Sequence, residues 1–230
     1  MITLGLDTAT SACAVALWDA ATGTCLAVRA EQMQRGLAER LVPMVEEVLA
    51  AAGIGFGAIG RIGVTVGPGT FTGLRVGLAA ARGFALAAGC PLVGVTTLEA
   101  AAAGLDPATR AGHTLLAAIE SRRDDLFVQP FTAALVPLGE PADVLPADLP
   151  AHAAATLPPG PLLIVGDAAA RAAQALGVWT GPVGVLETTG AAEALATARI
   201  AAAAGPADIA RRAADPFYLR PPDVTLPRPR

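Results

Sequence analysis

The amino-acid sequence predicts an α/β protein whose mixed sheets are flanked by helices. Short apolar segments of strand length alternate along the chain with longer segments of helical periodicity. Glycine-containing turns such as Thr22-Gly23 and Gly67-Pro68-Gly69 separate these segments. Over residues 1–103 the expected order is β-β-β-α-β-α-β-α, which favours a sheet covered by helices.

The first part of the chain is expected to begin with an antiparallel meander of three strands, because the Thr22-Gly23 turn lies between the second and third. Helical spacing of apolar residues then begins at Leu37, and Gly53 is suited to end that helix. Pro43 lies inside the pattern, which predicts a kink or a later start of the helix. The expected strands cover residues 2–7, 12–18, 24–30, 61–66 and 91–95, and the expected helices cover residues 37–52, 71–88 and 97–103.

The rest of the chain is expected to form a second unit, so that the two units comprise residues 1–103 and 104–230. The proline-rich stretch 137–161 predicts loops and short pieces, and the proline-rich C-terminal end is expected to be irregular. The expected strands of this unit cover residues 113–120, 126–131 and 162–165, with one helix ending near residue 176 and an alanine-rich helix at 189–204.

The composition excludes several kinds of chemistry. The chain has no lysine and no asparagine, so its 16 cationic residues are all arginine. It therefore contains no Schiff-base lysine, no P-loop lysine and no kinase-type phosphate lysine. Abundant alanine with arginine as the only basic residue is also the composition that a GC-rich genome produces.

Charge and cysteine content favour a soluble cytoplasmic protein. The net charge of −4 is opposite to that of a typical stand-alone nucleic-acid binder. Cys13, Cys25 and Cys90 form no CxxC pair, so neither a zinc site nor a disulfide framework is predicted. The chain begins without the basic segment of a signal peptide, and no uncharged apolar run reaches membrane-spanning length. We therefore expect no membrane partner.

Two loops are candidates for binding an anion or nucleotide. Gly67, Gly69 and Thr70 link a strand end to a helix start, where free N–H groups attract phosphate or carboxylate. Asp7 and Thr8 follow the first strand, where a carboxylate with neighbouring hydroxyls could hold a metal-bound phosphate. The alternatives are a tight turn with a capped helix for the first loop and an Asx turn for the second.

The helix at 71–88 carries a stripe of small residues, Gly73, Gly77 and Ala81, at helical spacing. Glycine inside a helix costs about 1 kcal/mol relative to alanine, and close approach of another helix commonly offsets this cost. The approaching helix could belong to a partner, with Arg75 and Arg82 at the rim of the contact. The alternative is ordinary packing within the chain.

Other polar groups have plain structural interpretations. Glu120, Asp124 and Asp125 lie near two arginines and could form an acid/base pair, but a solvated hairpin turn is the favoured explanation. His113 and His152 have no ligand at metal-site spacing, and no nucleophile pattern accompanies them. The arginine-rich C-terminal end could touch RNA or an acidic partner, or be a solvated tail.

Three segments together resemble one family. They are ITLGLDTATSACAVALW at the start, VGPGTFTGLRVGLAAARGFALAAGCPLVGVTTLEAAA in the centre and ADPFYLR near the end. They resemble the TsaB family, also called YeaZ, most specifically in the central stretch and more weakly after residue 103. The resemblance implies an actin/Hsp70/sugar-kinase-like fold of two RNase H-like halves, in agreement with the expected order of elements.

The resemblance also implies a role in tRNA modification. TsaB-like proteins associate with TsaD, a catalytic metal-binding paralogue, and with the ATPase TsaE. Together they transfer a threonylcarbamoyl group to N6 of adenosine 37 in tRNAs that read ANN codons. The metal histidines of TsaD would fall on Thr97 and Ala101, which cannot ligate a metal, and only Glu99 is retained. We therefore expect no catalytic residue, no metal and no catalytically bound cofactor in this chain. Whether ATP or ADP binds at the junction of the subunits is left open.

The resulting hypothesis is a non-catalytic subunit that pairs with a TsaD-like chain, and with itself when alone, through the helices of its first unit. Gly77→Leu is then expected to weaken association with little loss of fold. Many TsaB-like sequences have a histidine six residues before Pro43, where this chain has Leu37, so no role of that histidine carries over. The residues expected at the partner interface are Leu41, Met44, Val45, Val48, Gly73, Arg75, Gly77, Ala81 and Arg82.

The alternative from another functional class is a free-standing small-molecule kinase of the same superfamily. It would use Asp7 and the loop at residues 67–69 to bind ATP. Such an enzyme also needs a catalytic carboxylate facing the cleft between its halves, which the sequence does not single out. A peptidase would need the two missing metal histidines.

Overall fold

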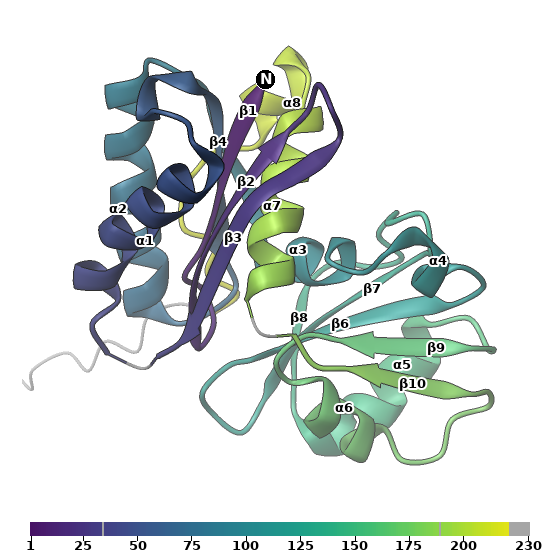
Figure 1. Ribbon diagram of the computed structural model, residues 1–230. Coiled ribbons are helices and arrows are strands. Elements are labelled where there is room, and N and C mark those ends of the chain that lie inside the picture. Colours follow the sequence, from purple (N-terminus) through teal and green to yellow (C-terminus); the bar gives the residue numbers. More distant parts are fainter. Residues whose placement is uncertain (34, 189, 221–230) are drawn as a thin grey trace, which may run out of the picture.

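The computed structural model describes residues 1–33, 35–188 and 190–220, and these form two five-stranded mixed sheets with helices between and around them (Figure 1). The first sheet has the strand order β3-β2-β1-β4-β5. Its strands are β1 (Ile2–Asp7), β2 (Ala12–Asp19), β3 (Thr24–Gln32), β4 (Ile59–Gly67) and β5 (Leu92–Thr96). Strands β1, β2 and β3 form the predicted antiparallel meander, and β4 and β5 extend the sheet in parallel.

Two helices cover one face of the first sheet (Figure 1). They are α1 (Leu37–Ala52) and α2 (Phe71–Ala88), joined through the short 3-10 helix η1 (Phe56–Ala58) and β4. Helix α1 runs through Pro43 without a break and ends at Gly53 in the left-handed conformation, as its sequence predicts. The apolar sides of both helices pack on β1, β2 and β4 in one continuous core.

The opposite face of the first sheet is covered by α7 (Ala191–Ala203), which reaches it from the far end of the chain (Figure 1). The two backbones are closest where glycines of β1 and β4 face the helix. A Cβ added at Gly5 would lie 2.2 Å from Ala194 O, and one added at Gly63 would lie 2.7 Å from Thr197 O. Glycines in the strands and alanines in the helix thus let the two backbones come together.

The second sheet has the strand order β10-β9-β6-β7-β8. Helices α5 (Leu149–Thr156) and α6 (Ala169–Leu176) cover one of its faces, and α3 (Thr97–Ala103) covers the other. The strands are β6 (Thr114–Glu120), β7 (Leu126–Phe131), β8 (Ala142–Val144), β9 (Leu162–Val165) and β10 (Val183–Leu186). The remaining short helices are α4 (Pro107–Arg110), η2 (Pro146–Asp148) and α8 (Pro206–Arg211).

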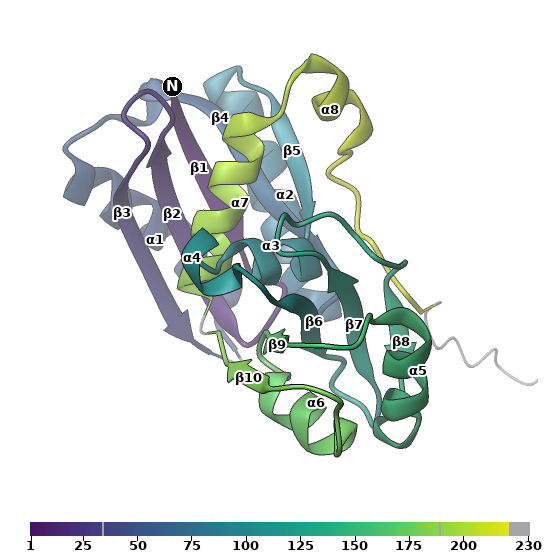
Figure 2. The same cartoon turned by 90° about the vertical axis from the view of Figure 1, so that its right-hand side faces the viewer.

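The predicted division at residue 103 is wrong for the last part of the chain. Helix α7 packs on the first sheet, and Gly94 of β5 donates a backbone hydrogen bond to Arg212 O. Phe217 N–H donates to Val66 O of β4 at 2.7 Å. Figure 2 shows the segment after α8 running down from the first sheet to the second. The chain therefore returns to its first sheet, and residues 191–220 tie the two halves together.

The sequence also misses two strands, β8 and β10, three α-helices, α4, α5 and α8, and the two 3-10 helices η1 and η2. Each is short, and β8 and α5 lie in the proline-rich stretch that predicts loops. Helix α8 lies in the end that is expected to be irregular, whereas residues 221–230 of that end lie outside the described residues. Elements this short carry too few residues for a periodic pattern.

Candidate functional site

The two loops that the sequence marks as anion-binding candidates meet at the end of β1, and most of their residues face the interior. The Ala9 N–H and the Thr65 hydroxyl donate to Asp7 Oδ1 at 3.0 and 2.7 Å. The Thr8 hydroxyl donates to Gly73 O at 2.7 Å. Both Asp7 and Thr8 are buried, so the structure does not place either side chain where a ligand could reach it. The prediction of an anion site at these two residues is wrong.

In the glycine loop, some residues pack against other parts of the chain and others line an open cavity. A Cβ on Gly67 would lie 2.4 Å from Phe217 O, so this glycine admits the C-terminal segment rather than a ligand. A Cβ on Gly69 would lie 2.3 Å from Ala9 O, yet Gly69 and Thr70 also line a cavity on their other side. Of the predicted anion-binding residues, only Gly69 and Thr70 therefore adjoin open space.

The small-residue stripe of α2 packs within the chain, which corrects its predicted role at a partner interface. A Cβ on Gly73 would lie 1.9 Å from Thr8 O, and one on Gly77 would lie 2.3 Å from Thr8 Oγ1. Ala81 is fully buried in the core of the first sheet. The close approach that these residues allow is to the β1–β2 loop and the sheet of their own chain.

The apolar residues of α1 require the same correction. They are buried against the sheet and have no surface left for a partner; they are Leu41, Met44, Val45 and Val48. Leu37, at the position where relatives often have histidine, packs in this core too. Helical periodicity finds the buried face of α1 correctly, but it does not say whether its own sheet or another chain covers that face.

The two predicted rim arginines hold the C-terminal segment. Arg82 Nη2 donates to Ala214 O and pairs with Asp215, each at 2.7 Å. Arg75 Nε lies 3.4 Å from the Tyr218 hydroxyl, and its guanidinium stacks 3.7 Å from the centre of the Phe71 ring. Phe71 and Tyr218 are themselves stacked, with ring centres 5.8 Å apart. These contacts fix residues 214–218 along α2.

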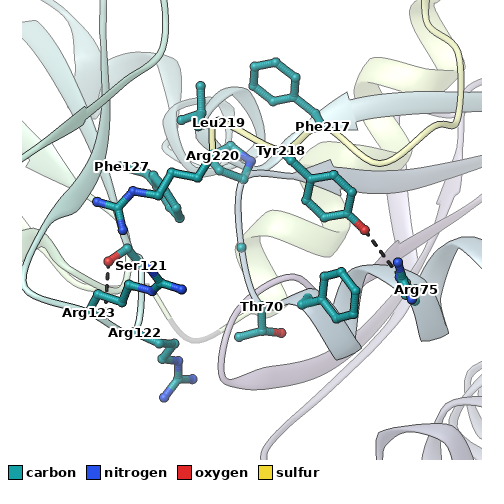
Figure 3. A pocket seen from close by; sticks show the side chains of 13 residues that line it. Thr70, Arg75, Ser121, Arg122, Arg123, Phe127, Phe217, Tyr218, Leu219 and Arg220 are labelled. Carbon is teal, nitrogen blue, oxygen red and sulfur yellow. Dashed lines mark hydrogen bonds between the residues drawn. The ribbon is translucent and has the colours of Figure 1, made fainter. Parts of the chain in front are cut away.

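A cavity of about 630 Å³ opens between the two halves beside these contacts (Figure 3). Arg75 and Tyr218 lie on one side of it, and Ser121, Arg122 and Arg123 from the β6–β7 turn lie on the other (Figure 3). Its lining residues are Pro68, Gly69, Thr70, Phe71, Arg75, Ser121, Arg122, Arg123, Phe127, Phe217, Tyr218, Leu219 and Arg220. The segment FYLR, which the sequence marks only as part of a family pattern, supplies one wall of this cavity.

The carboxylates of the β6–β7 turn have structural partners. Arg171 Nη1 donates to Glu120 at 2.8 Å, and its other nitrogen donates to the backbone carbonyl of Asp124. Asp125 is buried and pairs with Arg220, while the Ser121 hydroxyl donates to Asp125 Oδ1 at 2.8 Å. Hydrogen bonds and ion pairs thus hold the charged turn in place, and these contacts do not support an acid/base pair there.

Two buried carboxyl groups, Asp7 and Glu193, and the half-buried Asp167 have raised pKa values. Burial raises the pKa of Asp7 to about 7, and the negative charge of Glu193 adds to the shift. Burial, with Glu120 nearby, raises the pKa of Asp167 to about 6, and burial also raises that of Glu193. Within the described residues no group of three or more His, Cys, Asp or Glu side chains is arranged to hold a metal ion.

The TsaD-type metal positions lie inside the fold. Thr97 and Ala101 of α3 are fully buried. The retained Glu99 receives two hydrogen bonds from Arg212, at 2.8 and 2.7 Å, and so joins α3 to the end of α8. The Thr96 hydroxyl accepts from Glu99 N–H and caps the helix. In this chain the segment serves as a structural connection.

The sequence misses the exposed face of the α1–α2 pair. On α2 this outer helix face comprises Ala79, Gly83 and Leu86, which are exposed and recur at helical spacing, and α1 has an exposed apolar residue in Val42. Leu86 is 86% exposed and Val42 is 44% exposed. A glycine and a leucine on the polar side of the α2 pattern are the signal that could have indicated this face.

The part of the chain that the structure describes contains no helix with the length and apolar character needed to span a membrane.

Comparison with known proteins agrees with the fold. The family model for TsaD, tRNA N6-adenosine threonylcarbamoyltransferase, matches residues 28–161. YeaZ from Pseudomonas aeruginosa has a TM-score of 0.73 and 26% identity, covering 95% of this chain and 99% of that one. The ROK hexokinase of Thermus thermophilus shares the fold, with a TM-score of 0.55 and 18% identity over 87% of this chain and 98% of its own. The actin/Hsp70/sugar-kinase-like fold is confirmed.

Curated relatives place the chain more closely. The tRNA threonylcarbamoyladenosine biosynthesis protein TsaB of Escherichia coli (strain K12) is 39% identical over 127 residues, 54% of this chain and 52% of that protein. The match therefore spans about half the length of this relative. An uncharacterized protein of Mycobacterium tuberculosis (strain ATCC 25618 / H37Rv) is 33% identical over 170 residues, 74% of each chain. With its central motif, its YeaZ-like architecture and these relatives, the chain belongs to the TsaB (YeaZ) family of TsaD-related proteins.

Proposed function

We propose that this chain acts in the biosynthesis of tRNA threonylcarbamoyladenosine as a non-catalytic subunit that pairs with a TsaD-like catalytic chain. The names of the TsaB relatives from Escherichia coli and Haemophilus influenzae support the process. The pair would act together with a TsaE-like ATPase, and tRNA would bind to the complex of these subunits. Any ATP or ADP lies at a junction between subunits, where it is not held for catalysis by this chain.

The observation that carries the pairing is the outer helix face. Glycine inside a helix costs about 1 kcal/mol of stability relative to alanine. At Gly73 and Gly77 the close contact with Thr8 explains why glycine is present, because a larger residue would collide there. Gly83 has no such contact, because a Cβ there would meet nothing within 4 Å. A glycine with open space around it, beside a leucine that is 86% exposed, suits a surface that another helix approaches closely.

The proposed contact therefore uses different residues from those that the sequence predicts. Ala79, Gly83 and Leu86 take the place of the buried stripe, and Val42 takes the place of the buried residues of α1. A TsaD-like chain of the same fold presents equivalent helices, so the two could pair with approximate twofold symmetry, as could two copies of this chain.

The non-catalytic role is supported by the state of the polar groups. Thr97 and Ala101 are buried without a ligating side chain, and Glu99 is held by Arg212. The kinase alternative depended on Asp7, which is buried and bonded to Ala9 and Thr65. The cavity between the halves has no Asp or Glu among its lining residues to act as a catalytic base. We therefore do not propose the kinase.

The test is association with the TsaD-like protein of the same organism. Gly83→Glu places a charge on the outer helix face where the chain itself has room for a side chain. We expect pull-down of the TsaD-like protein, and threonylcarbamoyladenosine formation on tRNA by the reconstituted mixture, to fall at least about tenfold, equivalent to about 1.4 kcal/mol of binding free energy.

Ala170→Glu is the matched control, since Ala170 is also an exposed helical residue but lies on α6 of the other half. Gly77→Leu now has a different expected result from the one the sequence suggests. It should lower the thermal stability of the monomer, because its side chain would collide with Thr8. If Gly83→Glu binds TsaD-like protein as tightly as Ala170→Glu, the outer helix face is not the interface.

A further inference from the structure

A second cavity, of about 500 Å³, lies on another side of the molecule. This rear cavity shares no lining residue with the cavity beside Arg75 and Tyr218. Trp18, which forms one of its walls, pairs with Thr3 near the start of β1, whereas the β1–β2 loop beside the first cavity follows the other end of that strand. The rear cavity is lined by Trp18, Ala20, Ala103, Arg110, Leu135, Ala196, Arg199, Ile200, Ala202 and Ala203.

The walls of the rear cavity are apolar apart from two arginines. Helix α7 supplies Ile200 and three alanines, and the segment between β7 and β8 supplies Leu135. No Asp or Glu is among the lining residues. A concave, mainly apolar space of this volume with a few polar groups has the character of a small-molecule site. The two arginines therefore decide what kind of molecule suits it.

Arg110 is a buried cation with incomplete compensation. Its side chain belongs to a residue that is only 8% exposed, and arginine is rarely buried to this extent unless it is paired. Nη1 donates to Ala133 O at 2.9 Å, whereas Nε has no hydrogen-bond partner among the described residues. Burial and the positive charge of Arg199 lower the pKa of Arg110, and the charge of Asp106 opposes this only in part. The protein thus holds a guanidinium here at an electrostatic cost.

Arg199 adds a second positive charge to the same cavity. Its guanidinium lies 5.5 Å from the centre of the Trp18 ring, and it forms no hydrogen bond or ion pair with a residue that the structure describes. Two like charges beside one apolar space repel each other more strongly than they would in water. An anion in the rear cavity would offset the repulsion and the desolvation of Arg110 together.

We propose that the rear cavity binds a small apolar carboxylate, with the carboxylate group on Arg110 and Arg199 and the apolar part against Trp18, Leu135 and Ile200. The two oxygens of a carboxylate match the fork of N–H groups on a guanidinium. Phosphate is less suitable, because no hydroxyl or amide side chain lines the cavity to meet its additional oxygens. The site is formed by this chain alone, so it does not depend on the proposed pairing with a TsaD-like subunit.

Isothermal titration calorimetry on the full chain tests the site, with phenylpropionate as the probe. It should bind with a dissociation constant below about 1 mM. Phenylpropionamide has the same shape without the charge and should bind at least about tenfold more weakly. Acetate should also bind at least about tenfold more weakly, because it has no apolar part to bury.

Arg199→Gln should weaken phenylpropionate binding by about 10- to 100-fold, the usual effect of losing one charged hydrogen-bond partner. Arg199 is the residue to change because Arg110 also holds the backbone of Ala133, so that its removal would disturb the fold as well. Arg29→Gln is the matched control, since it removes the same charge from an exposed residue of β3 outside both cavities. Arg122→Gln removes it from the first cavity. Both should bind phenylpropionate like the wild type.

Four results would overturn the proposal. Phenylpropionate could fail to bind at about 1 mM, or its amide could bind equally well. Phenyl phosphate could bind more tightly than phenylpropionate, which would make this a phosphate site. Arg29→Gln or Arg122→Gln could weaken binding as much as Arg199→Gln, which would place the acid elsewhere. An acetylated peptide that ends in phenylalanine could bind where phenylpropionate does not, which would indicate the chain terminus of a protein partner.

Discussion

Asp7 shows how one residue can look like a ligand-binding group in the sequence and act as a buried polar group in the fold. Its position at the end of β1, followed by hydroxyl residues, is the position of a phosphate or metal site. The structure instead surrounds it with protein: Oδ1 accepts two hydrogen bonds, whereas Oδ2 has no hydrogen-bond partner among the described residues. Burial of a carboxyl group with an unpartnered oxygen favours its protonated form.

This environment predicts the pH dependence of stability. The pKa of Asp7 is about 7 in the folded chain and near its ordinary value of 3.8 when unfolded. Between these values the folded state binds more protons, so the free energy of unfolding should fall as pH rises from about 4 to about 7. Above pH 7 the ionised Asp7 destabilises the fold by at most about 4 kcal/mol. Asp7→Asn, which stays neutral, should be more stable than the wild type at pH 8 and similar to it at pH 4.5.

Urea unfolding at the two pH values measures this difference. Asp148→Asn, at an exposed carboxylate, is the control and should unfold like the wild type at both. Asp167 and Glu193 also have raised pKa values, so part of the pH dependence should persist in Asp7→Asn. If the variant is less stable than the wild type at pH 8, Asp7 is ionised and favourably solvated in the native protein.

At the scale of elements, the abundance of alanine has its clearest structural role in α7. Ala194 and Ala198 lie against Gly5, and Ala201 lies against Gly63, so helix and sheet approach without intervening large side chains. The same alanines give α7 little amphipathic signal, because both its faces carry small residues. The sequence therefore predicts the helix well but gives no indication of the sheet on which it packs.

Ala198→Leu tests this contact. Ala198 is fully buried, and its Cβ would lie 2.8 Å from a Cβ placed on Gly5, so three further carbons have no space. We expect the variant to lose about 1–3 kcal/mol of unfolding free energy, seen as a lower melting temperature by circular dichroism. Ala170→Leu, at an exposed alanine of α6, should melt like the wild type. Equal melting temperatures for the two variants would show that α7 does not press on the sheet.

At the scale of the whole molecule, the outer helix face makes this chain a candidate to pair with its own copies when alone. Leu86 is 86% exposed on that face, and burying it would favour association by about 1.5–3 kcal/mol. We expect sedimentation velocity of the isolated wild type to show a concentration-dependent dimer. Leu86→Glu should be monomeric over the same concentrations.

Val178→Glu is the control for that experiment, because Val178 is 99% exposed in the other half and the charge change is the same. It should dimerise like the wild type. A wild-type chain that is monomeric at every concentration, or a Leu86→Glu variant that still dimerises, would exclude self-association through the outer helix face.

The sequence by itself determined the order of the elements in the first sheet, because strands and helices of several turns carry local periodicity. It also determined the family, because the Gly67–Gly77 stretch is distinctive. It also identified the buried faces of α1 and α2. Only the tertiary structure decided what covers those faces, since a stripe of glycine and alanine permits close approach without choosing between its own sheet and another chain. The tertiary structure also returns residues 191–220 to the first sheet. It brings arginines from α2, the β6–β7 turn and the C-terminal segment together around one cavity. Both features consist of contacts between residues distant in sequence, and no local pattern encodes such contacts.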